Sequence, residues 1–251
     1  MINFFKKIRL GSLTENRFGK YLLYAIGEIV LVVIGILIAL KINNWNTDRK
    51  NDALKRSYYV QILQDLEKEK TLMTEANKHI DSFFIRLQSY KESFKKPNIS
   101  IWGATVGIGK VFSTEESQGW NLETNTNTIH TLINTGDIKL IPTKIRNKIL
   151  DFRHKQSGLL DYVKSQNLII SNASIATEKI YGGANLPTRI GNQTKLIEYF
   201  NDEKIALQSL LHLEALLYEE ELLLKNAYAR SNNLMQDIEE ITKIINEELK
   251  K

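Results

Sequence analysis

The sequence predicts an all-α protein in which one N-terminal transmembrane helix continues into an elongated antiparallel helical bundle with coiled-coil character. Residues 21–40 are apolar apart from one carboxylate, and neither residues 36–96 nor residues 194–251 contain a Gly or Pro. Apolar residues recur every three to four positions in both long segments, which is the spacing of a helix with one buried face. Helices of that length need partners, and an antiparallel bundle supplies them.

Composition narrows the functional classes. The 251 residues include no cysteine, which excludes a disulfide scaffold, thiolate-ligated zinc and iron–sulfur clusters. The net charge is +5, yet residues 1–56 hold ten Lys/Arg against four Asp/Glu, while the remainder holds 24 against 25. A nucleic-acid-binding domain carries its basic excess on the folded part, so we expect no nucleic-acid partner. The basic excess instead flanks the apolar segment.

Residues 21–42 are predicted to form a transmembrane helix. At ~1.5 Å per residue its apolar stretch matches the ~30 Å hydrocarbon core of a bilayer, and no convincing signal-peptide cleavage site follows it. Residues 1–20 read as a basic amphipathic segment at the membrane surface. Its membrane-facing cations are Lys6, Lys7, Arg9, Arg17 and Lys20. Five further Lys/Arg lie in residues 41–60, so the charge balance does not decide the orientation. A cytoplasmic N-terminus is favoured because the first set adjoins aromatic residues.

The span contains one carboxylate, Glu28. An acidic residue at the centre of a transmembrane helix costs ~2.5–3.5 kcal/mol on insertion scales, which calls for a partner. At about 100° per residue, Gly35 lies within about 20° of Glu28, and Ala25 and Ala39 lie on the same side. Gly35 and Ala39 form a small-xxx-small pair, which lets helices approach closely. The predicted transmembrane interface is therefore Glu28, Gly27, Gly35, Ala39 and Ala25. The alternative is a protonated or snorkelling Glu28 in lipid.

Residues 43–251 are predicted to form an extracytoplasmic helical domain. Pro97 ends the first long helix, and the glycines that follow predict an irregular insertion over residues 97–120. Gly136 suits the end of a short helix, and Pro142 and Thr143 start the next one. A second loop is expected over residues 181–193. The last segment is predicted to be one uninterrupted helix. Its apolar stripe comprises Leu207, Leu210, Leu211, Leu216, Leu217, Leu223 and Leu224.

Signals for catalysis are weak. The four histidines are scattered without the spacing of a zinc site, and we predict no metal and no cofactor. The stretch from Gly103 to Lys110 suggests a phosphate-binding loop. However, Gly103 and Gly109 are separated by five residues rather than four, and Val111 stands where Ser or Thr would bind magnesium. We therefore predict that the protein is not an enzyme, and no small-molecule substrate is evident.

Two stretches resemble a known family. They read ENRFGKYLLYAIGEIVLVVIGILIALKINNWN at residues 15–46 and NTGDIKLIPTKIRNKILDF at residues 134–152. Both are similar to a domain-of-unknown-function family of single-span membrane proteins from Bacteroidetes-type Gram-negative bacteria. The resemblance implies an envelope protein anchored by one N-terminal span. With the favoured orientation, we expect it in the bacterial inner membrane with its C-terminal domain in the periplasm. The resemblance implies no activity and no catalytic residues.

The expected function is that of a membrane-anchored protein that self-assembles or scaffolds an envelope complex. Its partners would be the lipid bilayer and either further copies of the chain or another membrane protein. The alternative is a transporter or channel component in which several copies of Glu28 line an ion or proton path. A ligand sensor is a third possibility, but its output would need a separate protein.

Overall fold

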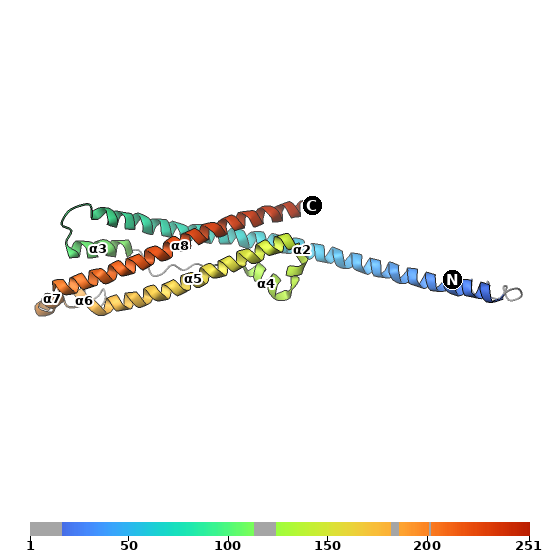
Figure 1. Cartoon of the computed structure of the whole chain (residues 1–251), viewed down its shortest axis with the longest axis horizontal. Helices are drawn as coiled ribbons and strands as arrows, with labels where there is room; N and C mark the ends of the chain where they lie inside the picture. The colour runs from blue at the N-terminus through green and yellow to red at the C-terminus, as the bar shows by residue number, and fades with distance from the viewer. Residues whose placement is uncertain (1–16, 113–123, 182–185, 201) are drawn as a thin grey trace. The chain divides into compact units, whose positions relative to one another are not determined.

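The computed structural model describes residues 17–112, 124–181, 186–200 and 202–251, and these are mainly helical, with no strand among them. The long helices are α2 (Arg17–Ser93), α5 (Thr143–Tyr181) and α8 (Glu203–Leu249). The shorter elements are α3 (Ile101–Phe112), α4 (Asn127–Thr135), the 3-10 helix η2 (Asp137–Leu140), α6 (Leu186–Arg189) and α7 (Thr194–Phe200) (Figure 1). The predicted all-α class is confirmed.

The chain forms two compact units, residues 1–57 and residues 58–251. In the first unit, the described residues belong to α2 and include the predicted span. This is the only helix of the described residues that is long and apolar enough to cross a membrane, and none of its apolar window is buried within the chain. The segment that follows is polar: Lys55 pairs with Asp52 at 2.8 Å, and Arg49 lies over the ring of Trp45. The first unit thus presents its apolar side chains to its surroundings.

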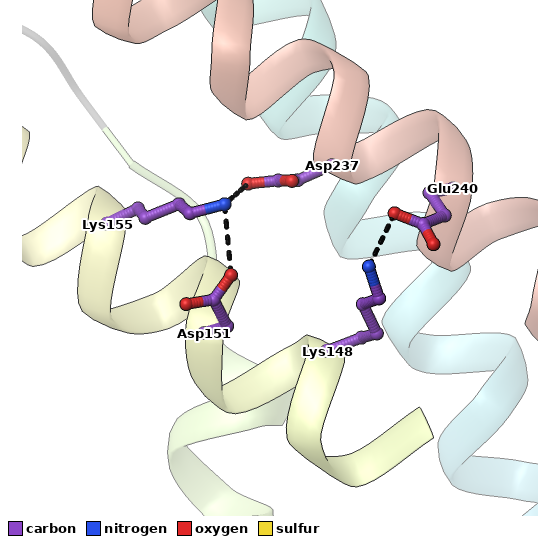
Figure 2. A network of polar contacts seen from close by, with 5 residues as sticks. All are labelled: Lys148, Asp151, Lys155, Asp237 and Glu240. Carbon is purple, nitrogen blue, oxygen red and sulfur yellow. Dashed lines mark hydrogen bonds and ion pairs between the residues drawn. The ribbon is translucent and has the colours of Figure 1, made fainter. Parts of the chain in front are cut away.

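The second unit is an antiparallel arrangement of α2, α5 and α8. Contacts from α2 to α8 join Lys70 to Glu239 and Lys91 to Glu221, so residue numbers rise on one helix as they fall on the other. Contacts from α5 to α8 also join rising residue numbers on one helix to falling numbers on the other, as Figure 2 shows. Lys148 pairs with Glu240 at 2.7 Å, and Lys155 lies 2.9 Å from both Asp151 and Asp237.

One continuous core runs through this unit. Each helix contributes apolar residues at helical spacing, because a stripe three to four residues apart stays on one face. The buried set includes Ile62, Leu66, Met73 and Ile80 of α2, Ile149, Phe152 and Leu159 of α5, and Leu223, Leu234, Ile238 and Ile241 of α8. Leu207 and Leu211 of the predicted stripe are instead exposed.

Two segments that were predicted to be irregular each contain a helix, and one predicted helix end is confirmed. The insertion over residues 97–120 contains α3, because Ala104, Ile108 and Val111 are buried at helical spacing and packing outweighs the low helix propensity of glycine. Residues 113–120 lie outside the described residues. The loop over 181–193 begins after α5 and contains α6, with residues 182–185 likewise outside the described residues. Gly136 ends α4 with a φ of 76°, as predicted.

The uninterrupted helix predicted over residues 194–251 is also wrong. It is divided into α7 and α8, although no Gly or Pro marks the division. Asp202 caps the start of α8, since its side chain accepts a hydrogen bond from the backbone N–H of Lys204 at 2.8 Å. A local side-chain cap of this kind competes with continuation of a helix.

Candidate functional site

The residues predicted to form a transmembrane interface all lie in α2 and are exposed within the chain. A Cβ atom placed on Gly27 or Gly35 would meet no other heavy atom within 4 Å. Packing inside the chain therefore does not require glycine at either position. Glu28, Gly35, Ala25 and Ala39 share one side of the helix, whereas Gly27 lies about 100° away from Glu28.

The predicted membrane-surface cations are only partly covered by the structure. Lys6, Lys7 and Arg9 lie outside the described residues. Arg17 and Lys20 belong to the first turn of α2, which is helical. The surface role of all five remains a prediction.

A buried polar cluster in the second unit was not predicted from the sequence. Its centre is Glu69 of α2, whose side chain has 0% exposure. One carboxylate oxygen accepts the backbone N–H of Asn125 at 2.5 Å, and the other accepts Nε2 of Gln156 at 2.6 Å. One turn earlier, Asp65 accepts the backbone N–H of Thr128 at 2.8 Å. Two carboxylates of α2 thus satisfy backbone donors at the start of α4, where the helix dipole favours negative charge.

The cluster extends to the surface through α5. Arg153 donates to Oγ1 of Thr126 at 3.1 Å and lies 2.5 Å from Nε2 of His130, which is exposed. Oγ1 of Thr126 also lies 3.3 Å from Oε1 of Gln156, to which it donates. The cluster therefore holds α2, α4 and α5 together through hydrogen bonds to nearly every polar atom it buries.

Burial shifts the pKa of Glu69. Desolvation raises the pKa of its carboxyl group, and the hydrogen bonds from Asn125 and Gln156 offset part of that rise. A sequence signal for the cluster does exist. Asp65 and Glu69 fall on the same apolar face of α2 as Ile62, Leu66 and Met73, where a solvated carboxylate is not expected.

A second buried carboxyl group lies on α8. Glu220 is 6% exposed, and desolvation raises its pKa to about 7.

Tyr90 of α2 contacts both α8 and α3. Its hydroxyl donates a hydrogen bond to Glu214 of α8. The ring of Tyr90 packs closely on Gly107 of α3, since a Cβ on Gly107 would lie only 2.7 Å from the ring. Gly107 is thus required where α3 meets α2.

The remaining chemical motifs do not assemble into a reactive site. Gly103, Gly109 and Lys110 belong to the helix α3 and form no phosphate-binding loop. In the part of the chain that the structure describes, no three His, Cys, Asp or Glu residues are grouped so as to hold a metal ion. The described arrangement is one of carboxylates that cap backbone donors and tie helices together.

Comparison with known proteins gives a match over part of the chain. Residues 28–149 match the model of a family of unknown function, DUF6090. No curated protein and no solved structure matches the chain significantly. The DUF6090 match begins at Glu28 and ends at Ile149, so it includes the Asp65–Glu69 pair and all of α4 but ends before α8. The resemblance to a family of unknown function is thereby confirmed over this part of the chain.

Proposed function

We propose that the protein is a membrane-anchored, non-enzymatic helical protein that self-assembles or scaffolds a complex in the bacterial envelope. The span contacts a second membrane helix through Glu28, Gly35 and Ala39. The observation that carries this proposal is the exposed side of α2 on which the Glu28 carboxyl group lies beside small residues, among them Gly35, where an added Cβ would meet no heavy atom within 4 Å. Interhelical packing in membranes relies on small residues and polar side chains. The resemblance to single-span proteins of Bacteroidetes-type bacteria agrees with it.

Substitution of Glu28 tests the proposal. If its carboxyl group bonds across a helix interface, Glu28→Leu is expected to weaken the oligomer by ~0.6–2 kcal/mol, the range for interhelical polar contacts in membranes. Glu28→Gln keeps the shape and the hydrogen bonding and is expected to preserve assembly. Leu37→Ala, on the opposite side of the helix, is the matched control and leaves assembly unchanged. The measurement is the mass of the purified, detergent-solubilised complex.

The same variants distinguish the second candidate function. If Glu28 lines an ion path, Glu28→Gln preserves the oligomer but abolishes proton flux in liposomes, because the titrating charge is lost. An equal mass and an absence of flux in wild type, Glu28→Leu and Glu28→Gln would contradict both the interface and the ion path.

Orientation has its own test. We expect protease added to intact spheroplasts to remove the C-terminal domain and to leave the N-terminus intact, because a long C-terminal domain translocates largely regardless of its charge. A tag at each end of the chain shows whether that end is cleaved or protected. Cleavage at the N-terminal tag together with full protection of the C-terminal domain would show the opposite orientation.

A further inference from the structure

We propose that α2 carries a binding site for the headgroup of an anionic phospholipid at the C-terminal edge of the span. The residues of this site are Lys41, Trp45 and Arg49, all of which are exposed within the chain. The inference rests on the proposed membrane anchorage, but it concerns a different side of α2 from the Glu28 interface. At about 100° per residue, Trp45 points about 100° away from Glu28. A helix packed against Glu28 therefore leaves Trp45 facing lipid.

The length of the span places Trp45 at the membrane surface. Ile42 is the last residue of the predicted span, and residues 43–47 are all polar apart from Trp45. At ~1.5 Å per residue, Tyr24 and Trp45 lie ~32 Å apart, close to the ~30 Å thickness of the hydrocarbon core. Tyr24 is 52% exposed and Trp45 is 64% exposed. Because Tyr and Trp concentrate at the two membrane–water interfaces, this spacing sets Trp45 at the level of the lipid headgroups.

Lys41 and Arg49 bring two cations to the level of Trp45. The three residues are spaced by four, so each step turns only about 40° around α2. The guanidinium of Arg49 lies over the ring of Trp45, 6.0 Å from its centroid, and therefore reaches back toward the span. Lys41 lies one turn before Trp45, and a lysine at the end of a span extends its ammonium group toward the surface. A lipid phosphate beside Trp45 is thus met by cations from both directions along the helix.

The neighbouring acids do not cancel these cations. Asp52 is paired with a lysine of its own helix at 2.8 Å. Asp48 points about 100° away from Arg49 around the helix and lies ~10 Å from Lys41 along its axis. Neither Lys41 nor Arg49 forms an ion pair with another described residue. Residues 41–50 hold three Lys/Arg against one Asp/Glu, so the charge at this level is positive.

This positive charge favours a lipid whose headgroup is negative overall. Basic residues at a bilayer surface attract anionic lipids electrostatically. A zwitterionic lipid carries its own ammonium group, which competes with Lys41 and Arg49 for the phosphate. Phosphatidylglycerol has a phosphate and no ammonium group, so its phosphate is free to bind both cations.

The fluorescence of Trp45 tests the proposal. Trp102→Phe and Trp120→Phe remove the other two of the three tryptophans. The full-length chain is then placed in phosphatidylcholine bilayers that contain an equal mole fraction of either brominated phosphatidylglycerol or brominated phosphatidylcholine, because bromine quenches an indole that it contacts. We expect phosphatidylglycerol to be preferred beside Trp45 by about threefold or more.

Two substitutions separate a site from general surface charge. Arg49→Gln is expected to abolish the preference for phosphatidylglycerol. Lys50→Gln is the matched control, because it removes the same charge from the next residue, which is exposed but points about 140° away from Trp45. Its preference should equal that of the parent chain. The preference is also expected to persist in a Glu28→Leu background, which separates the headgroup site from the helix interface.

The possible failures point to different causes. Equal quenching by the two brominated lipids would overturn the site and leave the span in place. An equal loss of preference in Lys50→Gln and Arg49→Gln would also overturn it, since it would show a diffuse surface charge. Reversal of the preference by added inorganic phosphate would assign the cations to free phosphate instead. Quenching by neither lipid would place Trp45 outside the bilayer and would contradict the membrane anchorage as well.

Discussion

Replacing Glu69 with leucine is expected to lower the free energy of unfolding of the second unit by about 2–5 kcal/mol. The substitution leaves the backbone N–H of Asn125 and the side-chain amide of Gln156 without the acceptors they now bond. A buried donor without a partner costs about 1–3 kcal/mol. Glu69→Gln keeps one acceptor oxygen and the side-chain shape, so its effect is expected to be smaller.

Glu67→Leu provides the control for Glu69→Leu. Glu67 lies on the same helix but is exposed, so its replacement is expected to change stability by less than about 0.5 kcal/mol. Urea unfolding of the full chain in detergent, followed by circular dichroism, measures both variants. Equal midpoints for Glu69→Leu and wild type would show that the start of α4 does not depend on α2.

Stability is expected to fall as the pH rises from about 4.5 to about 7, and Glu220 is the main cause. Burial raises its pKa to about 7 in the folded protein, from the ordinary value of 4.5 for a glutamate in water. The folded state therefore retains a proton that the unfolded state releases, and the stabilisation present below pH 4.5 is lost as the pH passes through 7. A difference of this size corresponds to about 3 kcal/mol. The raised pKa of Glu69 acts in the same direction.

Glu220→Gln is expected to remove most of this pH dependence, because glutamine does not titrate. Glu219→Gln, at the half-exposed neighbouring position, is the matched control and should retain the wild-type profile. The measurement is the unfolding midpoint in urea at several pH values between 4 and 8. A wild-type profile that is flat over this interval would show that Glu220 is hydrated in the folded protein.

The sequence alone predicts the long helices correctly, but it does not predict several of the residues at which helices begin or end. Periodic apolar residues and the absence of Gly and Pro identify α2, α5 and most of α8, because these signals are local. The glycines of α3 conceal a helix that exists through burial of Ala104, Ile108 and Val111, which is a tertiary effect. The break before α8 depends on one cap at Asp202.

The candidate sites also differ in how far they could be predicted from the sequence. The residues around Glu28 were identifiable because an acid in an apolar span is a local anomaly. For the Glu69 cluster the sequence offers only the acids on the apolar face of α2. The residues that bond them could not be predicted, since these hydrogen bonds join residues 56 and 87 positions apart in the chain. The stripe on α8 was recognised as apolar, but which of its leucines face the core depends on how α8 is rotated against α2 and α5.

The antiparallel pairing of α2 with α8 has a consequence for biosynthesis. Lys70 and Glu239 touch although 169 residues separate them, so the ribosome completes α2 long before it begins α8. At a synthesis rate of about 5–20 residues per second, the apolar face of Ile62, Leu66 and Met73 remains without α8 for several seconds or more. In that interval α4 and α5 can cover part of the face, as the bonds from Glu69 to Asn125 and Gln156 show, but the side chains that α8 adds to the core are missing. A chain released before α8 is made therefore leaves part of its core exposed, and we expect it to be degraded.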